Sequence, residues 1–312
     1  MDLVILIMTA GFLLLIYVWF PRSRTRIPPC PARRLPIVGN ICSLKQDTRT
    51  QFRTWWQQYG NIFSLYLGST HVIVLNGYDM FKEAFIKNGD ACSGRPRFFI
   101  DVASGLPGKG IIFASGSYWK EQKSVIVSIL RTFGMGTNVL AAKIMNERES
   151  LTECLAKLNG QPTDIHDMLY VSASNVISSI LFGQRFKHGD IEFQKIVETL
   201  KSLISDQQTT SLVNFMPWLH YLPGDYFKAK SITSNTHQLL NLLGMITDRK
   251  KRDVPDIVNV DNFIDAYMIE KDKRDKAGVI TTLDEDSLRK IMIELFAAGT
   301  ETSCTTIYWC VL

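Results

Sequence analysis

The chain has 312 residues, 46% of them hydrophobic, and carries a formal net charge of +5. Its cations are not concentrated in a stripe with interleaved aromatic residues, which argues against nucleic-acid binding. The six cysteines include no Cys-x-x-Cys pair, and the five histidines include no pair at metal-ligand spacing. The sequence therefore predicts reduced thiols and no zinc site.

The first 21 residues are predicted to form a transmembrane anchor. Residues 3–20 are nearly all apolar, and three arginines follow between positions 22 and 26. About 18 to 20 residues in a helix span a hydrocarbon core, and a basic flank stays on the cytosolic side. A cleaved signal peptide is the alternative interpretation, but the apolar run is long for one, lacks a basic start and has no small-residue cleavage site before Pro21.

Residues 22–40 are predicted to be a basic, proline-rich hinge. Four prolines between positions 28 and 36 are expected to stiffen the chain after the anchor and to hold the following domain in a fixed orientation relative to the membrane. That domain is expected to comprise residues 41–312.

The pattern of the remaining chain is mainly helical. Two strand-like runs, 61–67 and 71–75, are joined by Gly68-Ser69-Thr70 and predict a β-hairpin. The charged residues 248–253 are predicted to form a solvated loop. Apolar residues at helical spacing predict helices over residues 52–59, 80–88, 118–130, 144–158, 168–182 and 193–205. The fold class is therefore mainly α with a small β-sheet.

A further long helix is predicted over residues 286–312. Thr282 and Glu285 have the spacing of a capping box at its start. Its buried face is indicated by apolar residues at three-and-four spacing, namely Leu288, Ile291, Met292, Leu295 and Phe296.

A polar segment, residues 296–303, interrupts this helix, and we expect it to bury the acid Glu301 and two hydroxyls beside Gly299. A glycine inside a helix costs about 1 kcal/mol relative to alanine and lets a ligand approach the backbone closely. The hydroxyl of Thr302 is expected to bond back to the carbonyl of Ala298, which bends a helix. These residues alone leave two interpretations open, an ordinary core helix and a functional site.

The string Ala298-Gly299-Thr300-Glu301-Thr302-Ser303 resembles the oxygen-activation motif A-G-x-D/E-T-T/S of the cytochrome P450 family of haem-thiolate monooxygenases. The proline-rich hinge also resembles that family, with Cys30 where a glycine is usual. The resemblance runs along the whole chain and is strongest to the microsomal, family 2-like branch. It implies the cytochrome P450 fold.

The resemblance also implies a binding site for haem b. Trp119 and Lys123 resemble the family's W-x-x-x-R helix, whose indole and cation address a haem propionate, with lysine here in place of the bidentate arginine. A packed tryptophan beside a solvated lysine is the alternative interpretation. Arg95 matches a family turn whose arginine also points at a propionate. Ala298 and Gly299 complete the implied cofactor-binding set.

By the same resemblance, Thr302 and Glu301 are the catalytic residues that manage protons while one atom of O2 is inserted into a lipophilic small molecule, such as a lipid, steroid or xenobiotic. The substrate is expected to lie near Ile112, Phe113, Ile291 and Phe296. Electrons are expected from NADPH through NADPH-cytochrome P450 reductase, with cytochrome b5 as a second candidate partner. The implied location is the endoplasmic reticulum membrane, with a single-pass anchor and a cytosolic catalytic domain.

Electron transfer would require a docking surface for the acidic reductase. Lys120, Lys123 and Arg131 are candidates for its basic face.

The family's axial cysteine thiolate lies in a glycine-containing loop that these 312 residues do not contain. We therefore expect an incomplete catalytic domain, without activity by itself, whose iron ligand lies beyond the end of the chain. Cys92 is not expected to be that ligand, because Asn88 and Asp90 replace the loop's glycine and basic residue. The alternative function is a haem-free, membrane-anchored fragment that binds a partner or lipid. A soluble helical enzyme without haem is disfavoured by the anchor and hinge.

Overall fold

The computed structural model describes residues 9, 11–12, 27–133, 138–187, 190–252 and 260–311. Contacts divide the chain into two compact units, Met1–Cys92 and Ser93–Leu312. None of the helices in the described part of the chain is both long and apolar enough to cross a bilayer. The predicted anchor lies outside the described residues, apart from Thr9, Gly11 and Phe12, and so do the first five residues of the predicted hinge.

The first unit contains the β-hairpin that the sequence predicts. Strands β1 (Ile62–Leu67) and β2 (Thr70–Leu75) pair antiparallel, with Leu67 opposite Thr70. The turn is thus one residue shorter than expected, because Thr70 is already in the second strand. The other elements of this unit are η1 (Ile41–Ser43), α2 (Thr48–Tyr59), α3 (Tyr78–Phe81) and the π-helical η2 (Lys82–Lys87).

A small aromatic core joins helix α2 to the hairpin. Trp55 packs edge-on against Phe63, with ring centroids 5.9 Å apart, and Leu65 is buried beside them. The proline-rich segment bonds to the same strand, since the amide of Ser64 donates to the carbonyl of Pro29. Gly39 is required there, because its φ is +64° and a Cβ would lie 2.2 Å from a backbone oxygen of β1.

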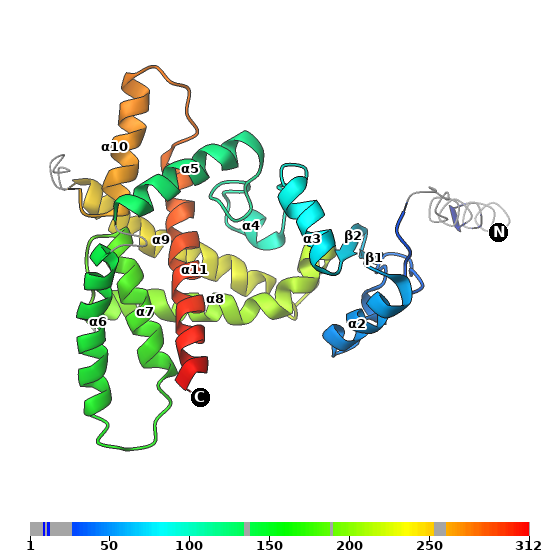
Figure 1. The fold of residues 1–312 in the computed structure, drawn as a ribbon, viewed down its shortest axis with the longest axis horizontal. Helices are drawn as coiled ribbons and strands as arrows, with labels where there is room; N and C mark the ends of the chain where they lie inside the picture. Colours follow the sequence, from blue (N-terminus) through cyan, green and yellow to red (C-terminus); the bar gives the residue numbers. More distant parts are fainter. Residues whose placement is uncertain are drawn as a thin grey trace. The chain divides into compact units, whose positions relative to one another are not determined.

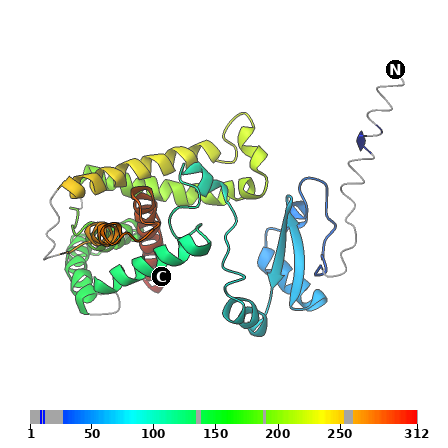
Figure 2. The same ribbon diagram turned by 90° about the horizontal axis from the view of Figure 1, so that it is seen from above.

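The second unit is helical in its described residues. Its elements are α4 (Phe99–Ala103), α5 (Gly116–Thr132), α6 (Asn138–Ala156), α7 (His166–Leu181), α8 (Ile191–Phe215), η3 (Pro217–Tyr221), α9 (Ala229–Arg252), α10 (Phe263–Lys276) and α11 (Glu285–Val311). Helix α11 packs along α7, which also contacts α6, and α8 lies beside α9 (Figures 1 and 2). The mainly helical class with a small sheet is confirmed.

The core of the second unit explains why these segments are helical. Helices α5, α7, α8, α9, α10 and α11 each supply apolar residues at three-and-four spacing, and these meet in one cluster. Leu288, Ile291 and Phe296 of α11 are fully buried in it. Burying such side chains stabilises the fold by roughly 1.5–3 kcal/mol each.

Helix α9 corrects the prediction of a loop over residues 248–253, because the helix continues to Arg252. Leu239, Leu243 and Ile246 anchor this helix in the core. The charged residues that follow extend it on its solvent side. Asp248, for example, lies 3.4 Å from the guanidinium of Arg289 on α11.

The start of α11 also differs from the predicted capping box. The carboxylate of Asp284 accepts the amide of Ser287 at 2.7 Å, so Asp284 is the capping residue. The hydroxyl of Thr282 instead donates to the carboxylate of Glu121 on α5. Glu121 also accepts bonds from Thr281 and from the guanidinium of Arg274. The segment before α11 is thereby tied to α5.

Candidate functional site

The polar segment of α11 is only partly buried. Thr300 is fully buried and Glu301 half-buried, whereas Ala298, Thr302 and Ser303 are exposed. The expectation that the acid and both hydroxyls lie in the interior is therefore wrong. Successive residues of a helix point in directions about 100° apart, so only one side of this segment can face α7. Ala298 and Thr302 lie on an open face in the described chain.

The hydroxyl of Thr302 makes the predicted bond to its own helix. Its Oγ1 donates to the carbonyl oxygen of Ala298 at 2.7 Å. Thr306 repeats the bond one turn later, with its Oγ1 2.7 Å from the carbonyl oxygen of Thr302. An exposed face of α11 thus carries two threonine hydroxyls in the same orientation.

Gly299 faces the neighbouring helix α7. A Cβ at this position would lie 2.5 Å from Cδ1 of Ile177. The glycine therefore allows α7 and α11 to approach closely. The expected approach of a ligand to this backbone is not what the described residues show, because Ile177 occupies the space.

Glu301 points toward α7 and lies on a different side of α11 from Thr302. Burial, followed by the nearby charge of Glu301, raises the pKa of the Tyr170 hydroxyl, and the same two causes raise the pKa of the Cys304 thiol to about 11. Thr305 donates to the Glu301 carboxylate at 3.3 Å. The two predicted catalytic residues are adjacent in sequence but have different surroundings.

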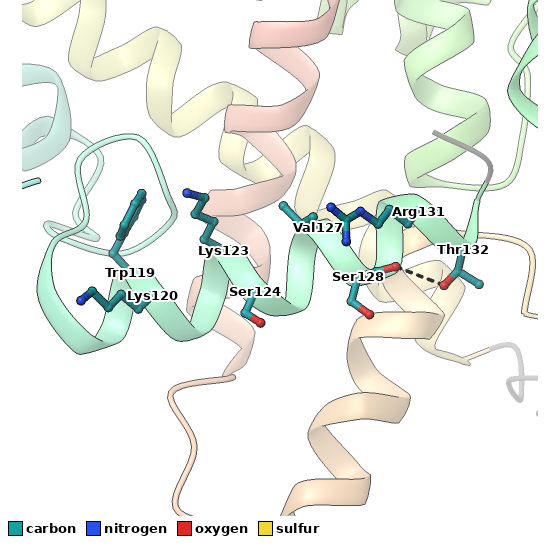
Figure 3. Close-up of a pocket in the computed structure, with 8 residues that line it drawn as sticks. All are labelled: Trp119, Lys120, Lys123, Ser124, Val127, Ser128, Arg131 and Thr132. Carbon is teal, nitrogen blue, oxygen red and sulfur yellow. Dashed lines mark hydrogen bonds between the residues drawn. The ribbon is translucent and has the colours of Figure 1, made fainter. Parts of the chain in front are cut away.

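Trp119 and Lys123 share one face of α5, as their spacing of one turn predicts. The ammonium of Lys123 lies 4.6 Å from the centroid of the indole. Both line an open groove with a volume of about 880 Å³ (Figure 3). In that view Trp119, Lys123 and Val127 point to one side of the helix, and Lys120 and Ser124 point to the other.

Arg95 is exposed and directs its guanidinium at its own turn, where it donates to the carbonyls of Ser93 and Gly94. Its backbone amide donates to Oγ of Ser115 at 2.8 Å. Ser115 directly precedes α5. The backbone of Arg95 is thus held at the start of the helix that carries Trp119 and Lys123.

Phe113 is the predicted substrate contact that lines a cavity. The cavity has a volume of about 280 Å³ and lies between the 98–113 segment, α8 and α9. Phe98 packs edge-on against Phe113 in it, with ring centroids 6.0 Å apart. Ile112 is exposed, whereas Ile291 and Phe296 are fully buried in the core. The substrate role of these three residues stays a prediction.

Sequence reasoning missed Glu294, which is 5% exposed on α11. Its Oε2 accepts the backbone amides of Ile111 and Ile112 at 2.6 and 3.1 Å. Burial raises the pKa of Glu294 to about 7, against the opposing effect of these amides and of Lys290. The available signal was the pair of charged residues, Lys290 and Glu294, spaced by one turn on an otherwise apolar face.

No group of three or more His, Cys, Asp or Glu side chains is placed to hold a metal ion among the residues that the structure describes. Cys92 is exposed in a turn that follows η2. Cys304 is buried and donates to the carbonyl of His166 at 3.7 Å.

Comparison with known proteins defines the class. The family model for cytochrome P450 matches residues 28–312. The chain is 33% identical to cytochrome P450 2J2 of Homo sapiens over 316 residues, which cover 99% of this chain and 61% of that protein. It is 34% identical to cytochrome P450 2C29 of Mus musculus over 320 residues, which cover 100% and 64%. It is 32% identical to cytochrome P450 2B2 of Rattus norvegicus over 309 residues, which cover 98% of this chain and 62% of that protein.

The chain belongs to the cytochrome P450 family. The names of these relatives place them in family 2, as the sequence resemblance indicated. The chain spans less than two thirds of their length.

Proposed function

We propose that the chain is part of a haem-dependent monooxygenase that inserts one oxygen atom of O2 into a lipophilic small molecule. Membership of the cytochrome P450 family supports this class of reaction. The observation that carries the proposal is the Thr302 hydroxyl, bonded to the Ala298 carbonyl on an exposed face of α11. The chain spans only part of its relatives, so the activity is proposed for the whole protein.

The residues present fit one edge of a haem. Its propionates are anionic, and the groove on α5 offers the Lys123 ammonium beside the Trp119 indole in open space. Arg131 lines the same groove and adds a second cation. Lysine can pair with a carboxylate only as a point charge, so the geometry of the pair differs from that of the usual arginine. The backbone of Arg95, held at Ser115, keeps a third cation at the start of the same helix.

A bound haem supplies the activation of dioxygen. In the proposed reaction Thr302 provides the proton of its hydroxyl group. In the structure this hydroxyl donates to the Ala298 carbonyl, and rotation of the side chain can break that bond. Glu301 holds a second exchangeable proton site on the same helix, close to Tyr170. Because the two side chains have different surroundings, water is expected to connect them.

The substrate side of the proposal rests on the cavity beside Phe113. Phe98, Phe113 and Ile100 supply apolar surface there, and Asn214 and Thr210 supply polar groups at the wall. The side-chain oxygen Oδ1 of Asn214 is already used, since it accepts the backbone amide of Phe99 at 2.7 Å. A lipophilic molecule with few hydrogen-bonding groups suits this lining.

We further propose that NADPH supplies electrons through NADPH-cytochrome P450 reductase, with cytochrome b5 as a second candidate donor. The proposed location is the endoplasmic reticulum membrane, with the catalytic domain on the cytosolic side. The apolar residues 3–20 and the arginines that follow support this proposal.

The test is the carbon-monoxide difference spectrum of the reduced protein, recorded for this chain and for the longest product of the same gene. A thiolate-type Soret band from the longer product supports the monooxygenase. If neither product binds haem or gives that band, the proposal fails, and the haem-free fragment that binds a partner or lipid becomes the leading function.

A further inference from the structure

Three charged side chains lie together in the core of the second unit, outside the predicted catalytic residues. Asp101 of α4 is 1% exposed, and Lys290 and Glu294 of α11 are each 5% exposed. The Lys290 ammonium lies 3.4 Å from Oδ1 of Asp101 and donates to Oγ of Ser104 at 2.7 Å. Two buried carboxyl groups thus share one buried cation, and the charges balance only if one acid is protonated.

Both acids hold the loop that leads to Phe113. Oδ2 of Asp101 accepts the amide of Gly108 at 2.9 Å. Oε2 of Glu294 accepts the amides of Ile111 and Ile112. The loop backbone between residues 108 and 112 is therefore fixed at both ends by carboxylates that neighbour the same lysine.

The fit around Glu294 is close. A Cβ on Gly110 would lie 2.4 Å from Oε2, and the φ of Gly110 is +83°. Within the described chain the other oxygen, Oε1, is buried without a hydrogen-bond partner. The loop is thus held through one oxygen of a carboxyl group whose other oxygen makes no hydrogen bond within the described chain.

We propose that Asp101 and Lys290 are positioning residues that set the charge of Glu294 and thereby fix loop 108–113 against α11. The role of the loop in a substrate pocket rests on the proposed function, whereas the bonds from Asp101 and Glu294 to the loop are a property of this chain. Among the residues that the structure describes, the charged groups that face Glu294 are Asp101 from α4 and Lys290 from its own helix, and the loop contributes amides.

The electrostatic effects of the two neighbours on Glu294 are opposite. Lys290 lowers the pKa of Glu294, and Asp101 raises it. An ionised carboxylate accepts charge-assisted bonds from Ile111 and Ile112, which are roughly twice as strong as bonds to a neutral acid. While Glu294 stays buried, its protonation therefore weakens the two bonds and loosens the loop locally, although it stabilises the chain against complete unfolding. The pH at which the loop loosens depends on both neighbours.

The experiment is residue-resolved hydrogen–deuterium exchange of this chain between pH 5 and 9, read at the amides of Ile111 and Ile112 and corrected for intrinsic exchange. Protection should fall by about tenfold as pH drops through about 7. Lys290→Met should move the midpoint to higher pH, and Asp101→Asn should move it to lower pH. Lys271→Met removes an exposed ion pair on α10 and should leave it unchanged.

Opposite shifts cannot come from general destabilisation, which would loosen the loop in the same direction in both variants. Shifts in the same direction, or protection of Ile111 and Ile112 that does not change with pH, would overturn the proposal. If Lys290→Met does not fold, the proposal is tested by the pH dependence of protection in the parent chain and by the shift of its midpoint in Asp101→Asn. The readout needs no haem, so it can fail or succeed independently of the monooxygenase proposal.

Discussion

The hydroxyl of Thr302 lies 2.7 Å from the carbonyl oxygen of Ala298, on a side of α11 that the described chain leaves exposed. Thr306 makes the same bond to the carbonyl of Thr302. The chain therefore contains two chemically identical threonines one turn apart, of which the family motif includes only the first.

This pair permits a matched test of the catalytic role. In the haem-loaded, full-length protein, Thr302→Ala should lower the product formed per NADPH by about tenfold or more and raise peroxide release, because a positioned proton donor is lost. Thr302→Ser should retain most of the coupling. Thr306→Ala removes an equivalent bond and should leave coupling intact; equal loss in both alanine variants would show a structural effect only.

Gly299 should respond to substitution through α7. Alanine favours a helix by about 1 kcal/mol over glycine, but here its Cβ meets Ile177. Gly299→Ala is expected to lower the free energy of unfolding, and to raise it by about 1 kcal/mol when Ile177→Ala is already present. Gly244→Ala on α9, where the new Cβ meets nothing within 4 Å apart from its chain neighbours and the backbone of its own helix, should stabilise in either background. Denaturant unfolding measures all of these changes, and a stabilising Gly299→Ala in the parent would contradict the packing role.

Glu294 should make the stability of the chain depend on pH. Its pKa in the folded state is about 7, above the ordinary value of 4.5, so the folded chain binds its proton more tightly. The resulting stabilisation is complete below about pH 4.5 and is lost as pH rises through about 7, by on the order of 3 kcal/mol. Glu294→Gln should remove this part of the pH dependence. Denaturant unfolding at pH 5 and pH 8 checks it, and an identical pH dependence in parent and variant would contradict it.

Lys123 should contribute to haem binding more than other exposed lysines do. Lys123→Ala is expected to weaken haem binding about fivefold, in line with about 1 kcal/mol for a partly exposed ion pair. Lys123→Arg should restore or improve binding, because the guanidinium can pair with a carboxylate through two hydrogen bonds. Absorbance titration with haem is the measurement. Lys276→Ala, on the exposed end of α10, is the control, and an equal effect there would remove the assigned role.

Reductase docking can be separated from haem binding on the same helix. Lys120 and Ser124 point away from the side that carries Trp119 and Lys123. Neutralising Lys120 while keeping Lys123 and Arg131 should slow electron transfer from the reductase most strongly at low salt, since exposed charges act over a screened range. Stopped-flow reduction of the full-length protein measures the rate. A rate that does not change at any ionic strength would remove this face from the docking surface.

Local pattern was enough to predict most elements of the fold. The hairpin and the helices that carry Trp119 and Thr302 follow from apolar spacing, because their buried faces are continuous. The end of helix α9 near Asp248 was predicted to be a loop, because charged residues on the exposed side of a helix have the composition of a loop. The folded structure shows that Asp248 lies beside Arg289 of α11, a contact that the local sequence does not indicate.

The site was less predictable, since its surroundings come from distant residues. The role of Gly299 depends on Ile177, and the cap of α11 depends on Glu121 taking Thr282 away from the helix end. The family motif predicts catalytic roles for Thr302 and Glu301, and it gave no indication that the two side chains face different neighbours. Asp101 and Lys290 are separated by nearly the whole second unit in sequence, so no local pattern could associate them.

The bond between Glu121 and Thr282 joins residues 161 positions apart. At roughly 5–20 residues per second, a ribosome makes these two residues about 10–30 s apart. During that interval α5 exists without the segment that ties it down and without α10, the helix that it contacts. The speed of translation through residues 121–282, and the chaperones available during it, should therefore govern how much of the newly made chain reaches this fold.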